Sequence, residues 1–496
     1  MRRTTPFTTA ALLGLALLAP ATAVSAAGET CRGEAASLVG TGPTLTGTEG
    51  RDVIVTGTAT TVNALGGDDL VCVTGAGSTT LVSVEAGAGN DTVDTTALRS
   101  ARDTSVDLGV GADTFIGGAS DDGVTTGPYE DVIAFPNGLD RDADTVSTGA
   151  GNDHVVHGIG TPALVKGDVA SGVPKSDVVD LGPGDDTVEW HPLAPEPDAS
   201  LTGGGGRDRL ALTLKSEGTA EVDLAAGTVR LTPEQATERT LAFSSFESAE
   251  ISRGSVGSGL PSIESLIVRG TPRDDELIVH TDNFFVPLML QVATRDGDDR
   301  VIIDGEPYRA GSVIDTGRGE DLLVAANSAG RTNEMPPGSS PASVELDLAR
   351  GVLEMEDVWR DELVPASVAG VENAFLMASE VTLTGGSEDD SLSWYGCRAT
   401  VRGGAGDDRL TTVDDDPWLD TFVFGCTPTS TMSGGSGKDR LSGGGGKDAL
   451  RGGGGKDRLD GRGGNDILLG GRGRDAADGG KGRDRCVAET STRCER

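Results

Sequence analysis

Six nine-residue units follow one another without a gap near the carboxyl end of the chain, and they constrain the fold more than any other feature. The first unit, GGSGKDRLS, runs from residue 434 to 442, and the sixth ends at residue 487. Each unit has Gly at its fourth position, Asp at its sixth and an apolar or small residue at its eighth. A flexible Gly-rich linker has no reason to keep one phase, so the pattern predicts a stacked repeat structure.

The spacing within a unit is suited to binding a hard cation. The glycines permit positive φ angles and close backbone approach, so the first six residues can turn tightly with their carbonyls pointing inward. The Asp adds a carboxylate to this ring of oxygens, and Ca²⁺ takes about 6–8 oxygen ligands in flexible loops. Positions seven to nine then form a very short strand whose eighth residue points inward.

The consensus GGxGxDxUx resembles the RTX, or haemolysin-type, calcium-binding nonapeptide repeat. The resemblance implies an all-β fold: a parallel β-roll or β-helix solenoid in which two nonapeptides make one coil, here with irregular strand-rich insertions. It implies Ca²⁺ as the cofactor, shared between repeats two units apart, so that six repeats hold about four ions. The ligand-bearing positions of the six units are Asp439, Asp448, Asp457, Asp466, Asp475 and Asp484, with Gly437, Gly446, Gly455, Gly464 and Gly473.

Degenerate units with the same phase occur upstream. The clustered units place their sixth-position carboxylates at Asp113, Asp122, Asp131, Asp144, Asp153, Asp177 and Asp186. Single units end in Asp52, Asp69, Asp91, Asp208, Asp275, Asp299, Asp321, Asp390 and Asp408. Many of these units have lost the first glycine, so we expect them to keep the path of the solenoid while only some hold an ion.

The middle of the chain contains a duplication. Residues 222–227 (VDLAAG) resemble residues 346–351 (LDLARG), and each stretch is followed by a related segment and a repeat remnant. We therefore expect a degenerate repeat solenoid over 27–210, a duplicated strand-rich region over 211–432, and a tandem calcium-binding β-roll with a disulfide-closed cap over 433–496. Glu234–Thr240 is the best candidate for a short helix.

The amino terminus predicts export. Arg2 and Arg3 precede an apolar run over residues 10–19 and a small-residue stretch, a pattern typical of a signal peptide, here 1–26. Ten apolar residues are too few to span a bilayer, and no other stretch is longer, so we expect no transmembrane segment and an extracellular location. Six cysteines in an oxidising compartment favour three disulfides, and we expect neighbours to pair: 31–72, 397–426 and 486–494.

The charge distribution is uneven. The chain has a net charge of −37, which excludes nucleic-acid binding as its main function. Residues 433–485 instead carry 12 Lys and Arg against 8 Asp, a net charge of +4 (12 − 8). Both a solvated surface and contact with an anionic cell-wall or extracellular polymer are compatible with this basic tract.

These features favour a secreted calcium-binding protein with a structural, adhesive or matrix role and calcium-dependent folding. The alternative is a β-helix enzyme acting on polysaccharides, a polyuronate lyase or epimerase, although only 17 aromatic residues (10 Phe, 4 Trp, 3 Tyr) are available to stack on sugars. A pore-forming toxin is disfavoured because the chain has no long apolar segment. No HExxH or GxSxG sequence occurs, so no catalytic residue is assigned and we expect a protein that is not an enzyme.

Overall fold

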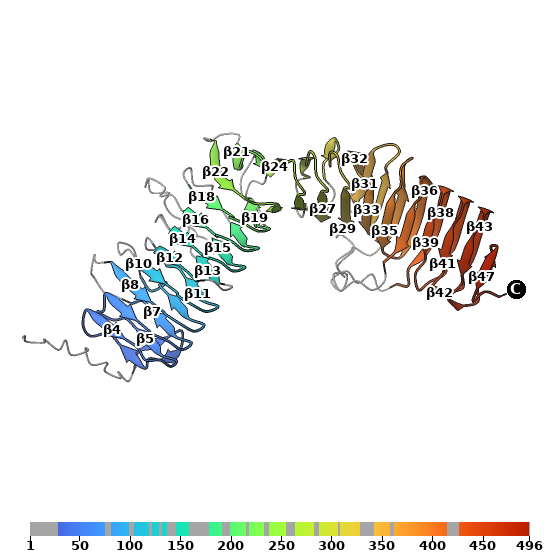
Figure 1. Ribbon diagram of the computed structural model, residues 1–496. Coiled ribbons are helices and arrows are strands. Elements are labelled where there is room, and N and C mark those ends of the chain that lie inside the picture. Colours follow the sequence, from blue (N-terminus) through green and yellow to red (C-terminus); the bar gives the residue numbers. More distant parts are fainter. Residues whose placement is uncertain are drawn as a thin grey trace, which may run out of the picture.

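The computed structural model describes residues 28–74, 81–98, 104–118, 122–127, 131–135, 145–157, 178–190, 199–214, 218–232, 238–253, 263–281, 287–305, 308–327, 342–357, 362–413 and 426–495. The predicted signal peptide and two of the predicted ligands, Asp144 and Asp177, lie outside these residues. The described chain forms an elongated solenoid that bends near its middle, with the two termini at opposite ends (Figure 1).

Two stacks of mostly parallel strands run along the solenoid, and each coil contributes one strand to each stack except two coils that contribute three strands to the first. The first stack, sheet I, contains in spatial order β4 (Thr44–Thr46), β6 (Thr61–Asn63), β8 (Val82–Glu85), β10 (Thr104–Asp107), β12 (Asp122–Thr125), β14 (Thr145–Ser147), β16 (Val178–Asp180), β18 (Ser200–Thr202), β22 (Arg239–Ser244), β21 (Thr228–Thr232), β20 (Gly218–Asp223), β24 (Ile263–Arg269), β26 (Met289–Ala293), β28 (Ser312–Asp315), β32 (Glu362–Ala369), β31 (Val352–Asp357), β30 (Ser343–Asp347), β34 (Glu380–Thr384), β36 (Arg398–Ala405), β38 (Thr429–Gly437), β40 (Ala449–Gly455), β43 (Ile467–Gly473) and β46 (Arg485–Val487).

The second stack, sheet II, is parallel throughout its described strands. It contains β3 (Leu38–Val39), β5 (Val53–Val55), β7 (Leu70–Cys72), β9 (Thr92–Asp94), β11 (Thr114–Ile116), β13 (Val132–Phe135), β15 (His154–His157), β17 (Thr187–Trp190), β19 (Arg209–Leu214), β23 (Ser248–Arg253), β25 (Glu276–His280), β27 (Arg300–Gly305), β29 (Leu322–Asn327), β33 (Asn373–Met377), β35 (Ser391–Tyr395), β37 (Arg409–Thr412), β39 (Arg440–Ser442), β41 (Arg458–Asp460), β44 (Ala476–Asp478) and β47 (Thr490–Thr492).

Two small elements stand apart from these sheets. β1 (Thr30–Cys31) and β2 (Glu34–Ala35) form an antiparallel hairpin at the amino end, and β42 (Gly463–Gly464) pairs with β45 (Lys481–Gly482). Both main sheets continue through residues 210 and 432, so the three expected segments are stretches of one solenoid.

The carboxyl-terminal coils contain two nonapeptides each, which confirms the predicted β-roll. Arg440 pairs with Arg458 in sheet II and Ala449 pairs with Ile467 in sheet I, both 18 residues apart. The eighth-position residues all face the interior between the sheets: Leu441, Leu450, Leu459, Leu468 and Ala477 are buried, and Cys486 packs against them. Alternation along a strand puts every second side chain on one face, so one apolar residue per unit is enough to fill a narrow core.

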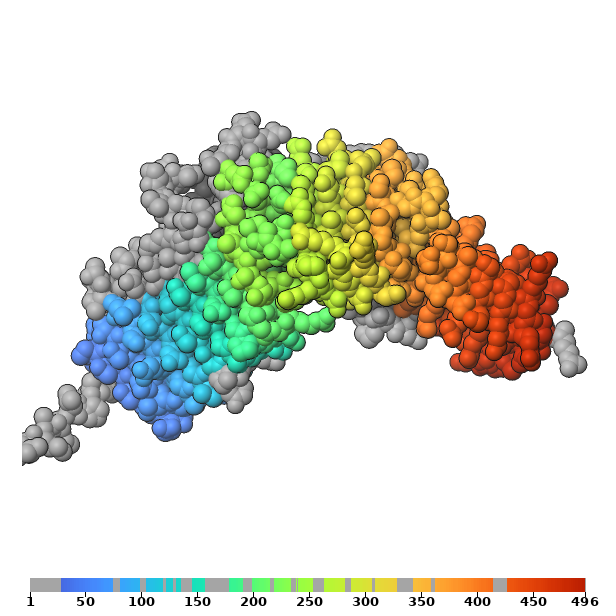
Figure 2. Space-filling model, turned by 45° about the horizontal axis from the view of Figure 1, so that its top comes forward, coloured from blue at the N-terminus to red at the C-terminus, as the bar shows by residue number. Residues whose placement is uncertain are grey.

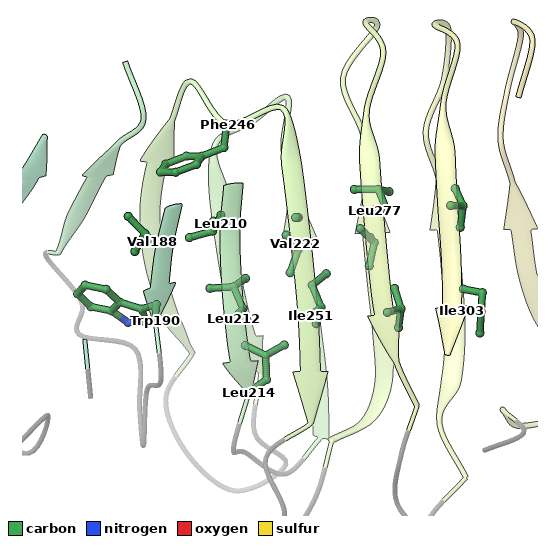
Figure 3. Packing of buried hydrophobic residues seen from close by; sticks show 14 of the residues in the cluster. Val188, Trp190, Leu210, Leu212, Leu214, Val222, Phe246, Ile251, Leu277 and Ile303 are labelled. Atoms are coloured by element: carbon green, nitrogen blue, oxygen red, sulfur yellow. The ribbon is translucent and has the colours of Figure 1, made fainter. Parts of the chain in front are cut away.

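The interior is a single column of apolar side chains running the length of the described solenoid. Around the middle it contains Trp190, Leu212, Val222 and Ile251, which project between the two stacks of strands (Figure 3). Small repeat units thus bury a continuous core only by stacking, as expected for a solenoid. Within the described residues no helix is long and apolar enough to cross a membrane.

The predicted duplication corresponds to two equivalent excursions of sheet I. In each one an antiparallel three-stranded unit, β20–β21–β22 or β30–β31–β32, is inserted between parallel neighbours. The tight turns match: Asp223 accepts a hydrogen bond from the Ala226 amide at 2.8 Å, and Asp347 accepts one from the Arg350 amide at 2.9 Å. Gly227 and Gly351 follow with φ angles of 63° and 64°, which favour glycine.

The expected helix over 234–240 is wrong where it can be tested, because Arg239 and Thr240 begin strand β22. Pairing with β21 on one side and β18 on the other outweighs the weak helical preference of the segment. The three expected disulfides are all present, between Cys31 and Cys72, Cys397 and Cys426, and Cys486 and Cys494. Neighbouring cysteines pair because a solenoid keeps sequence neighbours close in space.

Candidate metal centre

The sixth-position aspartates stack on one another along the corners of the solenoid, most of them along the corner where the chain enters sheet II. The amide of Asp439 donates to Oδ1 of Asp457 at 3.0 Å, and the amide of Asp457 donates to Oδ1 of Asp475 at 3.0 Å. Each carboxylate thus binds the main chain of the preceding coil. We call such a stack an aspartate ladder.

The described chain contains four aspartate ladders. The first runs through Asp52, Asp69, Asp91, Asp113, Asp131, Asp153, Asp186 and Asp208. The second contains Asp275, Asp299 and Asp321. The third contains Asp390, Asp408, Asp439, Asp457 and Asp475. The fourth contains Asp448, Asp466 and Asp484, on the opposite corner, where the chain enters sheet I.

All tandem-repeat aspartates therefore fall into the third and fourth ladders, which alternate from unit to unit. Upstream, Asp113, Asp131, Asp153 and Asp186 belong to the first ladder. Asp122 differs: it lies on the sheet I side, where it accepts hydrogen bonds from the Thr95 and Thr104 hydroxyls and the Gly118 amide. With two units per coil, the middle of three tandem units must fall on the opposite corner, which explains why Asp122 lies outside the ladders.

The second carboxylate oxygen is the chemically significant one. Oδ2 is buried without a hydrogen-bond partner, in the part of the chain that the structure describes, in Asp408, Asp439, Asp457, Asp466, Asp475 and Asp484. An unpaired buried oxygen of a carboxylate costs several kcal/mol unless a proton or a cation compensates it. The ladders thus present a row of oxygens that lack a protein donor.

The first-position glycines open a space beside these oxygens. A Cβ atom placed on Gly452 would lie 2.4 Å from Oδ2 of Asp457 and 2.6 Å from the carbonyl oxygen of Gly470, one coil further on. Gly461 stands in the same relation to Asp466 and Gly479, at 2.5 and 2.6 Å. Carboxylate and carbonyl oxygens therefore converge on a point that only glycine leaves free.

The fourth-position glycines bring the coils into close contact. A Cβ atom on Gly455 would lie 1.6 Å from the carbonyl oxygen of Gly437, and one on Gly473 would lie 1.5 Å from that of Gly455. Gly464 relates to Gly446 in the same way at 1.9 Å. These predicted residues serve the site by allowing successive loops to stack, with their carbonyl oxygens in register.

The oxygen set fits calcium. Within the described chain, no three Asp, Glu, His or Cys side chains gather into a metal-binding cluster. What each loop offers is one carboxylate oxygen together with main-chain carbonyls in flexible glycine-rich backbone. Hard oxygen donors of this kind suit Ca²⁺ rather than softer metals, which prefer nitrogen or sulfur.

Each ladder begins with a carboxylate that its own loop satisfies. Oδ2 of Asp448 accepts a hydrogen bond from the Gly444 amide at 2.8 Å, and Oδ2 of Asp390 accepts one from the Gly386 amide at 2.7 Å. Asp275 and Asp52 are closed in the same way by the amides four residues earlier, at 2.6 and 2.7 Å. The first aspartate of each ladder thus lacks the unpaired Oδ2 atom that later aspartates present.

Each ladder ends at a glutamate, which the sequence analysis did not assign. The amides of Asp208, Asp321, Asp475 and Asp484 donate to Oε2 of Glu247, Glu372, Glu489 and Glu495, respectively. The detectable signal was the duplication, since Glu247 and Glu372 occupy matching places in the two related segments. The coils that contribute these glutamates lack the GGxG loop. The Glu side chain is longer than Asp, so it still reaches the amide of the last aspartate in the ladder.

An outer row of fifth-position side chains runs beside the ladders. In this row the amide of the later coil donates to the carboxylate of the earlier coil, which is the reverse of the direction in the ladders. The Asn90 amide donates to Oδ1 of Asp68 at 2.9 Å, whereas the Asp69 amide donates to Oδ1 of Asp91 at 2.8 Å. The same outer bond recurs from Asp407 to Asp389. The two rows together tie each loop to the loops before and after it.

Burial raises the pKa of the ladder carboxyls. Removal from water is the main cause, and neighbouring carboxylates add to it; the pKa of Asp439 rises to about 6 and that of Asp466 to about 7. The upstream Asp113 behaves alike, with a pKa of about 7. Without a cation, the ladders therefore resist full ionisation near neutral pH.

Comparison with known protein families agrees with the site. The model for the RTX calcium-binding nonapeptide repeat matches residues 140–161, 431–459 and 451–486, in four copies. No curated protein sequence matches the chain. The chain therefore carries RTX calcium-binding nonapeptide repeats, most clearly in the carboxyl-terminal coils.

Proposed function

We propose that this RTX-repeat chain is a secreted protein that binds Ca²⁺ along its aspartate ladders and uses the ions to fold its carboxyl-terminal coils. The observation that carries the proposal is the set of buried Oδ2 atoms that have no partner among the described residues, in Asp439, Asp457, Asp466, Asp475 and Asp484. A divalent ion supplies the positive charge that these oxygens lack. It would be held by the sixth-position carboxylates and by carbonyl oxygens of adjacent loops.

The size of the repulsion between neighbouring carboxylates favours ladders that bind a cation over ladders whose charge is not compensated. Parallel strands lie about 4.8 Å apart, and two unit charges at that distance repel by about 3 kcal/mol at an effective dielectric constant of 20. A run of five such neighbours opposes folding by an amount comparable to the whole stability of a domain, about 5–15 kcal/mol. Ions that bind only the folded coils offset this repulsion by mass action.

The number of calcium ions can be counted from the successive aspartate pairs within the ladders. Four successive pairs lie within the tandem repeats: 439/457, 457/475, 448/466 and 466/484. Two further pairs, 390/408 and 408/439, continue the third ladder upstream. We propose that Ca²⁺ occupies these pairs, because each contains at least one open Oδ2 and first-position glycines.

Upstream, the ladders keep their hydrogen bonds while the first-position glycine is often replaced. Ala64 and Leu108 occupy that position before Asp69 and Asp113, and both are buried in the core. Before Asp131 the position is Thr126, whose hydroxyl donates to the Thr148 carbonyl one coil later. We propose that these coils keep the solenoid path and that few of them bind calcium.

A structural, adhesive or matrix role outside the cell accords with the shape and chemistry. The described chain is an elongated, bent solenoid (Figures 1 and 2) with three disulfides, and disulfides persist in oxidising compartments. The segment 1–26 would direct export. Extracellular calcium is abundant enough that weak sites of about 10⁻⁴–10⁻³ M suffice.

Isothermal titration calorimetry on the full mature chain tests the proposal. Replacing Asp439, Asp457 and Asp475 by Asn should remove the calcium heat of the third ladder, whereas Asp107→Asn, at an exposed site outside the ladders, should leave it unchanged. The proposal fails if the triple variant binds as many calcium ions as the wild type.

A further inference from the structure

The outer face of sheet II carries a row of arginines at the carboxyl-terminal coils. Arg409 pairs with Arg440, and Arg440 pairs with Arg458, so the three side chains project from directly adjacent strands β37, β39 and β41. All three side chains are exposed, and the charge of Arg440 contributes to lowering the pKa of the Asp407 carboxyl. Like charges directly opposite one another destabilise a sheet, so their alignment needs a compensating reason.

A second row runs parallel to the arginines, two residues further along each strand. Thr411 pairs with Ser442, and Ser442 pairs with Asp460. The two rows enclose a shallow groove of about 150 Å³, which follows the long axis of the solenoid across the strands. Arginines line one side of the groove and mainly hydroxyl groups the other.

The groove leads into a larger basic depression. Arg462 lines both, and an adjoining pocket of about 780 Å³ includes Lys481 and the main chain of Gly463. Counted over the described residues alone, the combined surface holds five cationic side chains and one acid, Asp460, in a protein whose net charge is −37. At physiological salt the Debye length is about 8 Å, so the acidic coils further away are largely screened from this surface.

We propose that this groove binds a linear acidic polysaccharide that lies along the solenoid axis. The arginines recur at the strand spacing of about 4.8 Å, and their guanidinium groups form strong charge-assisted hydrogen bonds with carboxylates. A polyuronate carries a carboxylate and free hydroxyls on every sugar, which match the arginine row and the hydroxyl row. Asp460 in the second row can accept a hydrogen bond from a sugar hydroxyl, whereas a polyphosphate has no hydroxyl group to donate to it.

The proposal rests in part on the proposed calcium function. Each groove arginine directly follows a third-ladder aspartate: Asp408, Asp439 or Asp457. Calcium at the ladder would fix the backbone from which the arginines project and would add positive charge beneath them. Calcium therefore increases the affinity of the groove for the polysaccharide.

Fluorescence anisotropy with a labelled oligogalacturonate tests the proposal on the full, calcium-loaded chain. The variant R409Q/R440Q/R458Q should bind at least about tenfold more weakly and should flatten the dependence of affinity on salt. The matched control R402Q/R451Q/R485Q removes three exposed arginines from sheet I and should change affinity less than about twofold. Equal losses in the two triple variants would overturn the assignment to this groove.

Two further probes establish the ligand class. The methyl-esterified oligomer should not bind, and T411V/S442A should weaken oligogalacturonate binding more than polyphosphate binding. Polyphosphate or single-stranded DNA bound as tightly as oligogalacturonate would overturn the polysaccharide assignment. Calcium titration of each variant separates the two proposals, because a groove variant that keeps its calcium stoichiometry but loses the oligomer affects only the groove.

Discussion

The amide of Asp457 donates a hydrogen bond to Oδ1 of Asp475, one coil further on, while Oδ2 of Asp475 is buried without a partner. One oxygen of the carboxylate is therefore structural and the other is free for an ion. The structural role of Oδ1 and the ion-binding role of Oδ2 can therefore be tested separately by a suitable substitution. Asn at the same place retains the acceptor Oδ1 and removes the charge.

Exchanging Asp457 and Asp475 for Asn should change stability in opposite directions with and without calcium. In chelator, the double variant should be more stable than the wild type by about 1–3 kcal/mol, because like-charge repulsion is relieved. In millimolar Ca²⁺ it should be less stable, because ligands are lost. Denaturant titrations under both conditions measure this, and a change of the same sign in both would contradict the assignment of Oδ2.

The glycine at the first position should be essential for calcium binding. In Gly452→Ala, the new Cβ would lie 2.4 Å from Oδ2 of Asp457, so the carboxylate must move and calcium affinity should fall by about tenfold or more. Gly454 in the same loop is a matched control, since its nearest neighbour would be 3.9 Å away. Calcium calorimetry on both variants distinguishes them, and comparable affinity in the two would refute the role of the open space.

Acid should stabilise the calcium-free protein. The ladder carboxyls have a pKa raised above the unfolded value of 3.8, to about 6 for Asp439 and about 7 for Asp466. Their protonated forms favour the folded state, so this contribution is present below pH 4 and is lost as the pH rises towards 7. Thermal unfolding in chelator should therefore give a higher Tm at pH 5 than at pH 7.5.

Calcium should reverse that dependence, because protons and ions compete for the same oxygens. In millimolar Ca²⁺ the Tm should be higher at pH 7.5 than at pH 5. An identical pH profile with and without calcium would show that the ladder carboxyls do not bind the ion.

Removal of the last disulfide should loosen only the end of the solenoid. Replacing Cys486 and Cys494 by Ser opens a loop with a sequence separation of 8, which should cost about 2–3 kcal/mol in the terminal coils. Coils of a solenoid contact mainly their neighbours, so hydrogen exchange should speed up in β44, β46 and β47 but not in β7 or β9. Uniform acceleration along the chain would indicate a single cooperative unit instead.

The fold of the tandem units could be predicted because each repeated position in a unit has one structural role. Gly437 allows close stacking, Asp439 bonds to a coil 18 residues away, and Leu441 fills the core, so the phase alone gives the fold and the carboxylate positions. The same local logic gave the disulfide pairs. The sequence also indicated the duplicated segments, although not the antiparallel excursions that they form.

The ends of the ladders were not predictable in the same way. Glu247 and Glu372 end the first and second ladders, and the amide that each glutamate reaches is set by how its coil stacks on the coil before it, which the local sequence does not show. Likewise, the closure of Asp448 by the Gly444 amide cannot be told from the open Asp457, since both units begin with two glycines. The pairing of Arg440 with Arg458 follows from the predicted 18-residue coil, but the pairing of Arg409 with Arg440 depends on the register of β37 and β39, which a spacing of 31 residues does not reveal.

The stoichiometry of calcium on the full chain is the most direct test of the central claim that the ladders are ion sites. Protein stripped with chelator, dialysed and titrated by calorimetry should bind at least four Ca²⁺ per chain and should gain β-structure in circular dichroism as they bind. Protein that binds no calcium and gives one unchanged spectrum throughout the titration would contradict the account.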